Sequence, residues 1–213
     1  MQKMLFTCIL FLVTLATLAC SVTDPSQPIV KKQPEENMLH IEPIDLFAGE
    51  AAKFKPFLGT MAGAVKLKYT GDKKEIQAEV ELWENGVRTK TLGSVGSLIQ
   101  GSQEGKQSFE GEFIVSIKKE QVNENKPHFE VTSAIVDKDG STASTIYLVD
   151  RVEKLTGLNS IPLNKSMDVS ENSKVAVWGM QATDENVIET VELTPEGLQK
   201  VKWALVVTIS LKN

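Results

Sequence analysis

The stretch EIQAEVELWENGVRTK, residues 75–90, alternates apolar and polar side chains and carries Asn-Gly at 85–86. This alternation predicts a half-buried β-strand, because successive side chains of a strand point to opposite faces. Asn and Gly both tolerate the positive φ of a two-residue type I′ turn, so they predict a tight hairpin. The expected cross-strand pairs are Glu84–Val87, Trp83–Arg88, Leu82–Thr89 and Glu81–Lys90.

A second hairpin is predicted at VDKDGST, residues 136–142. If Asp139-Gly140 forms a two-residue turn, the strands on both sides keep their alternation. In that register, Ile135, Ser133 and Val131 lie opposite Ser144, Ile146 and Leu148. We therefore expect Ile146 and Leu148 on the buried side of their strand.

Further alternating segments occur at residues 64–70, 107–118 and 201–212. The expected inner residues of the two longer segments are Phe109, Phe113, Val115 and Ile117, and then Val201, Trp203, Leu205, Val207, Ile209 and Leu211. Gly111 falls on an inner row and predicts a bulge or a close approach. Residues 173–182 are apolar on both faces around Trp178, as in a central strand.

Repeated strands with turn signals between them predict a mainly β fold, specifically an antiparallel β-sandwich, with an immunoglobulin-like architecture as one alternative. The Cys–Trp–Cys pattern of antibody domains is absent. We expect at most short helical turns, one of them starting at Thr194-Pro195-Glu196. We expect a single β-rich domain over residues 41–213, with a possible subdivision near the loop-like residues 151–172.

The composition of the chain argues against several classes of function. The chain has 213 residues, a formal net charge of −5 and no block of basic residues, which argues against nucleic acid as a partner. Its two cysteines, Cys8 and Cys20, both lie near the N-terminus, so a disulfide framework or cysteine metal site in the body is excluded. No nucleotide, metalloprotease or hydrolase motif is present, and we expect no cofactor.

The N-terminal segment has the form of a secretory signal. After Lys3, residues 4–19 are uncharged, which is shorter than the ~20 residues of a comfortable membrane span. The segment ends in Thr17-Leu18-Ala19-Cys20 and resembles the lipobox of bacterial lipoproteins, although Thr17 stands where Leu, Val or Ile is usual. The resemblance implies a diacylglycerol on Cys20, cleavage before it, and attachment to the cell membrane on its extracytoplasmic face. Ordinary signal cleavage at the same bond and a retained anchor are the alternatives.

The same segment sets the expected domain bounds. Residues 1–19 are the signal peptide, and residues 20–40 are the lipidated N-terminus and a polar, proline-punctuated tether. Two acyl chains anchor a protein stably, whereas one chain binds reversibly. We therefore expect the β-rich domain to be held at the membrane by Cys20 through a flexible linker.

Few side chains in the body have a pattern that predicts chemistry. His40 falls in the expected tether and His128 at a loop-to-strand junction, and both positions indicate exposed loop histidines. Asp137-Lys138-Asp139-Gly140-Ser141 resembles the start of a calcium loop, but Leu148 stands where the loop requires glutamate. The sequence shows no metal site and singles out no catalytic residue.

Trp83 and Arg88 are the residues on which a ligand site can be based, because an exposed aromatic ring stacks on apolar ligand faces. The leading expectation is a lipid-anchored envelope protein with a binding domain, acting on an envelope protein or wall glycan. The alternatives are a structural subunit of an envelope complex and a glycan-directed enzyme that uses carboxylates. An aromatic–carboxylate cleft around Trp83 favours glycan, whereas a flat apolar patch favours a protein partner.

Overall fold

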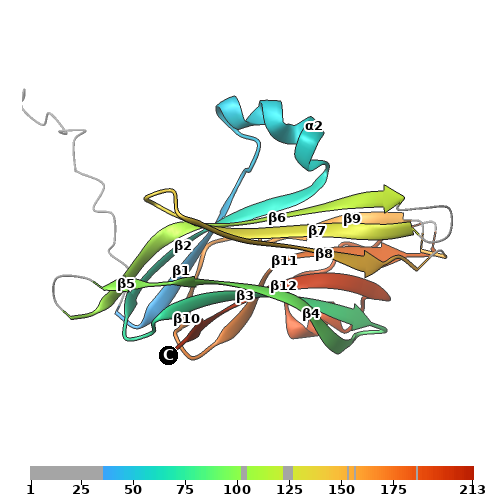
Figure 1. Ribbon diagram of the computed structural model, residues 1–213. Coiled ribbons are helices and arrows are strands. Elements are labelled where there is room, and N and C mark those ends of the chain that lie inside the picture. Colours follow the sequence, from blue (N-terminus) through green and yellow to red (C-terminus); the bar gives the residue numbers. More distant parts are fainter. Residues whose placement is uncertain (1–35, 102–104, 122–126, 153, 156, 186) are drawn as a thin grey trace, which may run out of the picture. The chain divides into compact units, whose positions relative to one another are not determined.

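Two antiparallel β-sheets pack face to face in the computed structural model, which describes residues 36–213 except 102–104, 122–126, 153, 156 and 186 (Figure 1). All the described strands belong to one unit, Pro34–Asn213. The first sheet has the order β10-β1-β2-β6-β7-β8, with β5 paired to β6. Its strands are β1 (Met38–Ile44), β2 (Met61–Gly71), β5 (Gln100–Gly101), β6 (Gln107–Gln121), β7 (Pro127–Asp137), β8 (Thr142–Asp150) and β10 (Met167–Ser170).

The second sheet has the order β4-β3-β12-β11-β9. Its strands are β3 (Glu75–Glu84), β4 (Val87–Leu98), β9 (Gly157–Pro162), β11 (Lys174–Thr183) and β12 (Trp203–Lys212). The C-terminal strand β12 lies at the centre, and every residue except Lys212 is buried. Its alternation predicted only the inner row from Trp203 to Leu211. Val201, also expected in that row, precedes the strand and packs with Ala204 and Val206 on the other face. The predicted antiparallel β-sandwich is confirmed. It has twelve described strands, whereas immunoglobulin domains have seven or nine.

The core between the sheets is built from the inner rows that the alternation predicts. Phe129 of the first sheet and Trp203 of the second meet there, with ring centroids 5.8 Å apart. Gly111 lies on the inner row of β6, and a Cβ atom there would lie only 2.4 Å from the carbonyl oxygen of Val136. The register of β6 continues through Gly111 without a shift, so this glycine marks a close approach rather than a bulge.

The predicted Asn85-Gly86 turn is confirmed, with φ values of 51° and 76°. The two pairs nearest the turn, Glu84–Val87 and Trp83–Arg88, are also confirmed. Beyond them the expected register is wrong: Leu82 pairs with Lys90, and Glu81 pairs with Thr91. The cause is irregularity in β4, since each β-bulge adds one residue that has no partner on β3.

The predicted register of the β7–β8 hairpin is wrong by one residue. Gly140 adopts φ of 86°, and the N–H of Asp137 donates to the carbonyl of Ser141 at 3.0 Å, so residues 138–140 form a three-residue turn. A shift of one residue moves every side chain of a strand to the other face. Ile146 and Leu148 therefore point away from the core, with 65% and 54% of their surface exposed.

Two predicted boundaries also change. Residues 151–172 are not a loop between subdomains, because they contain β9 of the second sheet and β10 of the first. This segment therefore links the two sheets. The first sheet begins at Met38, so it takes the last three residues of the expected tether, and residues 20–35 of that tether lie outside the described part of the chain.

A segment that we call the cover segment, residues 184–202, lies on the outer face of the second sheet. It contains α3 (Pro195–Leu198), which begins at the predicted cap: the Oγ1 of Thr194 accepts the N–H of Gly197 at 3.1 Å. Together the cover segment and the sheet bury a second apolar cluster of Ile161, Val191, Leu198, Val201, Ala204 and Val206. The outer face of the second sheet is thus partly interior.

A helical projection, residues 45–60, joins β1 to β2 and stands above the first sheet on the side away from the second (Figure 1). We call it the arm. It consists of the 3-10 helix η1 (Gly49–Phe54) and one turn of α-helix, α2 (Lys55–Leu58), and neither has a buried residue.

Candidate functional site

The sequence singled out Trp83 and Arg88, and the structure places both on the outer face of the second sheet, next to Glu81. The side chain of Glu81 is 4% exposed. Its carboxylate accepts the indole N–H of Trp83 at 3.3 Å and the guanidinium Nη1 of Arg88 at 3.2 Å. The ring of Trp83 packs against the cluster beneath the cover segment. Glu81 is thus buried beneath Trp83, which is half-buried, and Arg88, whose side chain is 50% exposed.

Lys174 completes the network around Glu81. Its Nζ lies 2.6 Å from Oε1 of Glu81 and also pairs with Glu79. Burial acts to lower the pKa of Lys174, but its hydrogen bonds to Glu79 and Glu81 outweigh that effect and raise the pKa. The network joins β3, β4 and β11 and has its charges matched internally. It stabilises the covered face and offers no free carboxylate.

The two histidines were predicted to be loop residues, and this prediction is wrong. Both lie in strands. His40 belongs to β1, and its Nδ1 lies 2.7 Å from Oδ1 of Asp168 on β10. His128 belongs to β7, and its Nδ1 lies 3.1 Å from Oδ1 of Asp150 on β8. Each histidine has a carboxylate from the neighbouring strand beside it. The two sites lie on different strand pairs and do not form a shared centre.

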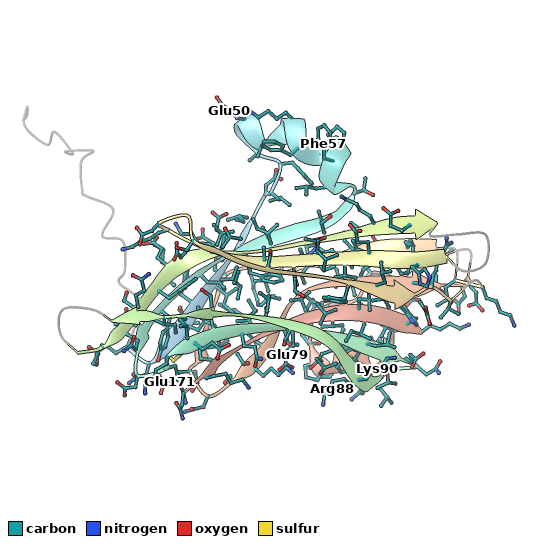
Figure 2. The ribbon with its side chains drawn as sticks, viewed as in Figure 1. Glu50, Phe57, Glu79, Arg88, Lys90 and Glu171 are labelled. Carbon is teal, nitrogen blue, oxygen red and sulfur yellow. The ribbon has the colours of Figure 1, made fainter. Side chains whose placement is uncertain are left out.

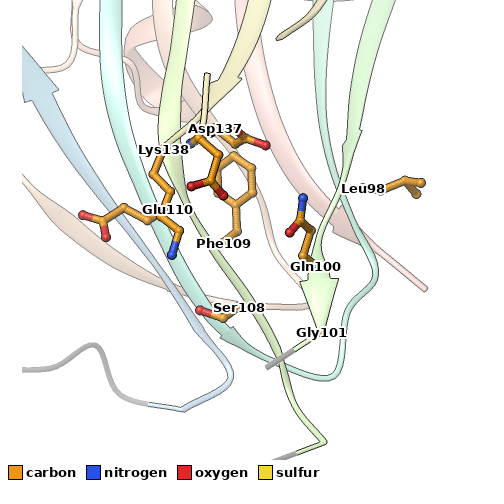
Figure 3. Close-up of a pocket in the computed structure, with 9 residues that line it drawn as sticks. Leu98, Gln100, Gly101, Ser108, Phe109, Glu110, Asp137 and Lys138 are labelled. Carbon is orange, nitrogen blue, oxygen red and sulfur yellow. Dashed lines mark hydrogen bonds between the residues drawn. The ribbon is translucent and has the colours of Figure 1, made fainter. Parts of the chain in front are cut away.

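A pocket of about 350 Å³ opens where β5, β6 and the β7–β8 turn meet (Figure 3). Phe109, Glu110, Asp137 and Lys138 contribute to its lining. The Oδ1 of Asp137 accepts the N–H groups of Asp139 and Ser141, both at 2.9 Å, so this carboxylate holds the turn. That is the role of the motif that superficially resembles a calcium loop.

Glu110 and Asp139 are the other acidic residues of this pocket. The Oε1 of Glu110 lies 3.2 Å from the Nζ of Lys68 and 3.3 Å from that of Lys66. Hydrogen bonds from these two lysines lower the pKa of the Glu110 carboxyl. A carboxyl with a lowered pKa stays ionised at neutral pH and is a poor general acid. Glu110 is therefore unsuited to the general-acid role in glycoside hydrolysis.

A second pocket, of about 490 Å³, lies at an open end of the sandwich. Met61, Ile117, Phe129 and Met180 give it an apolar lining, with lysines in the adjacent positions 118 and 119. Its apolar wall is continuous with the main core. It contains no carboxylate or histidine among its lining residues.

The most distinctive surface is the middle of the outer face of the first sheet, which we call the neutral face. Two rows of paired residues run across the strands there: Ile44, Ala64, Ile114, Ala134 and Ser144 in one row, and Ala62, Ser116, Thr132 and Ile146 in the other. None is charged. The row on one side contains the pair Lys66–Glu112, and the row on the other side contains Lys118–Glu130.

Sequence analysis missed this surface because the expected register turned Ile146 and Leu148 inward. The available signal was the choice between a two-residue and a three-residue turn at residues 138–140. Asp at the first position of a type I turn, followed by Gly in the left-handed region, is also typical of a three-residue hairpin loop. The correct turn moves two large aliphatic side chains from the core to the surface.

Fold and surface together define a mainly β, two-sheet antiparallel sandwich with two uncharged rows across the outer face of one sheet. Comparison of the chain with protein-family models, curated proteins and solved structures finds no match. In the described residues no group of three or more His, Cys, Asp or Glu side chains is placed to hold a metal ion. No helix within that same part is long and apolar enough to cross a bilayer. Cys20 and the signal segment lie outside the described residues.

Proposed function

We propose that this chain is a lipid-anchored protein of the bacterial cell envelope whose sandwich binds a protein partner through the neutral face. The observation that carries this proposal is the absence of charge in two adjacent rows across four or more strands, between rows that are charged. The chemistry proposed is recognition, in which the anchor keeps the domain at high effective concentration near partners in the same layer.

The composition of the neutral face supports a protein contact. An antiparallel sheet face that meets only water normally carries polar and charged side chains. The cores of protein interfaces, in contrast, are depleted of charge and rich in apolar surface. Here Ile146 is 65% exposed, and Leu148, in the adjoining row, is 54% exposed.

The lipid anchor is supported by the sequence of the first 20 residues alone. An apolar run of signal length ends in Thr-Leu-Ala-Cys, and a polar segment with three prolines follows before the first strand. Changing Cys20→Ser is expected to move the protein from the membrane fraction to the precursor or soluble pool. Unchanged fractionation, with no loss of acyl label, contradicts the anchor.

The partner contact is tested by site-specific photo-cross-linking on intact cells. A photoreactive residue in place of Ser144 is expected to give a discrete protein adduct, and Ile146→Glu in the same chain is expected to abolish it, because a charge enters the uncharged row. Val187→Glu is the matched control: Val187 is also aliphatic and 72% exposed, but lies in the cover segment.

Two outcomes contradict the proposed contact. One is an adduct that survives Ile146→Glu. The other is no protein adduct together with retention of the chain on purified wall polymer, which would favour the glycan-binding alternative. Equal loss with Val187→Glu would show that the cross-link reports general damage and not the neutral face.

A further inference from the structure

The arm exposes two phenylalanines in a segment that buries nothing of its own. Phe54 is 50% exposed and Phe57 is 71% exposed. Figure 2 shows Phe57 and Glu50 on the arm, away from both sheets. Large aromatic side chains left in water on a projecting element are unfavourable for a monomer, since each buries substantial apolar area when covered. The exposure of these two side chains is therefore better explained by a contact with another molecule than by the stability of the fold.

Lysines accompany these aromatic side chains. The Nζ of Lys53 lies 5.4 Å from the ring centroid of Phe54, and that of Lys55 lies 5.8 Å from the centroid of Phe47. In residues 46–60 the only acidic residue is Glu50, whose side chain is 98% exposed and 4.0 Å from Lys53. With Asp45 at its start the arm is neutral overall, and its two lysines stand beside its aromatic rings.

The two ends of the arm are fixed to the domain. At its start, the carboxylate of Asp45 accepts the N–H of Phe47 at 3.0 Å. At its end, the hydroxyl of Ser116 on β6 donates to the carbonyl of Leu58 at 2.7 Å, and Gly59 leaves the helix with φ of 81°. The arm is therefore a positioned, convex projection. A projecting segment can insert into a lipid bilayer or into a groove of another protein, whereas the neutral face is proposed to bind a protein surface.

We propose that the arm inserts Phe54 and Phe57 into the interface of an anionic lipid bilayer, with Lys53 and Lys55 at the level of the lipid phosphates. Interfacial segments combine these two features: aromatic or aliphatic side chains at the headgroup–acyl boundary, and lysines that interact with anionic headgroups. The long methylene stems of lysine allow the charge to reach the phosphates while the stem lies against apolar groups. The proposal rests on the proposed lipid anchor, which keeps the arm within reach of the bilayer.

This contact has a consequence for the neutral face. The arm ends on Ser116, one of the residues of the neutral face, and rises from the same side of the first sheet. Insertion of the arm turns the neutral face toward the membrane surface. The partner expected there is a protein embedded in or attached to the same bilayer.

The test is the depth of residue 57 in full-length protein reconstituted in vesicles of phosphatidylcholine and phosphatidylglycerol. Phe57→Trp supplies a fluorescent probe, and emission of the parent chain, from Trp83, Trp178 and Trp203, is subtracted. We expect a blue shift of the probe and loss of its emission when the lipids carry bromine on their acyl chains. Leu98→Trp is the matched control, because Leu98 is 79% exposed on β4 and is expected to show neither effect.

The role of the two lysines is tested with the same reconstituted vesicles. Lys53→Ser with Lys55→Ser is expected to reduce quenching at residue 57 on vesicles that contain phosphatidylglycerol. On pure phosphatidylcholine, the two serines are expected to change quenching little. Because the arm has no buried residue, the thermal unfolding curve is expected to be the same in every variant; Phe54→Trp provides a second probe position if Phe57→Trp alters it.

Three results overturn the arm–bilayer contact. The first is a water-exposed spectrum at residue 57 in chains that co-float with the vesicles, which leaves the anchor intact. The second is a blue shift that depends on protein concentration and not on lipid, which indicates a second copy of the chain. The third is equal quenching at residues 57 and 98. Chains that fail to co-float contradict the anchor, and the arm is then judged by adding the same vesicles to the soluble chain.

Discussion

The outer faces of the two sheets differ in what covers them. On the second sheet, apolar side chains such as Ala204 and Val206 are fully buried because the cover segment packs over them. On the first sheet, the side chains of the neutral face include Ile146, most of which is exposed. The neutral face is covered only in part by its own chain: Ala64 and Ser116 are buried, with 7% and 4% exposed, whereas Ser144 and Ile146 on β8 are exposed.

This difference separates residues that stabilise the fold from residues available for contacts. Side chains under the cover segment contribute free energy of folding through the area that they bury. The exposed side chain of Ile146 contributes little to folding while it remains in water, so its apolar character is better explained by binding. Substitutions matched in type and placed on the two faces test this interpretation directly.

The largest expected effect is that of Leu198→Ala. Leu198 is 4% exposed in the cluster beneath the cover segment, and truncation of a buried leucine costs about 2–5 kcal/mol in the free energy of unfolding. Leu148→Ala, next to the neutral face, is expected to change that free energy by no more than about 0.5 kcal/mol. Urea denaturation of both variants, followed by far-ultraviolet circular dichroism, gives the two values.

Similar values for the two leucine variants would break the comparison. A large loss for Leu148→Ala would mean that the first sheet is also covered by its own chain, and the neutral face would no longer be available to a partner. A small loss for Leu198→Ala would mean that the cover segment is loosely attached. The slope of the denaturation curve should not change in either variant, since neither alters the surface exposed on unfolding by much.

The sequence predicted the sheets better than it predicted their outer faces. Alternation in β3, β6 and β12 gave the correct inner rows, because a buried face imposes a strict period of two. The Asn85-Gly86 turn was also predictable, since few residues adopt the positive φ values that it needs. These features depend on short-range sequence alone.

The outer faces depend on information that local patterns lack. The bulge in β4 between Arg88 and Lys90 moved Glu81 from Lys90 to Thr91, and the alternation of β3 does not reveal it. Trp83 was expected on a solvent face, and its position is correct, but the cover segment that packs on it lies about a hundred residues away in sequence. Long-range coverage of this kind explains why the sequence did not predict the contacts of Trp83 and Arg88 with the buried Glu81.

The carboxylates of Glu81, on the second sheet, and Glu110, on the first, form a second pair for comparison. Both are expected to affect the free energy of unfolding less than Leu198→Ala does. Glu81→Gln removes the charge that pairs with Lys174 and Arg88 while keeping the size of the side chain. Because the Glu81 side chain is only 4% exposed, we expect a loss of about 1–3 kcal/mol in the free energy of unfolding. Chemical denaturation at neutral pH measures it, and Arg88→Lys is a control that keeps the charge. A loss under about 0.5 kcal/mol would show that the network is no stronger than an ordinary surface ion pair.

The smallest expected effect is the dependence of stability on acid at Glu110, on the first sheet. Hydrogen bonds from Lys68 and Lys66 lower the pKa of this carboxyl from 4.5, so the folded state favours its ionised form. The resulting stabilisation is present above the pKa of the unfolded chain and is lost as the pH falls through the lower folded pKa. Because 44% of the side chain is exposed, solvent screening limits the contribution to a few tenths of a kcal/mol, about that of a surface ion pair. Denaturation midpoints measured between about pH 5 and pH 3 should therefore fall slightly less steeply for Glu110→Gln than for the parent chain. A decline in Glu110→Gln as steep as that of the parent would assign the acid sensitivity to other carboxyls, such as Asp184 on the covered side, whose pKa is lowered by its hydrogen bond from Lys202.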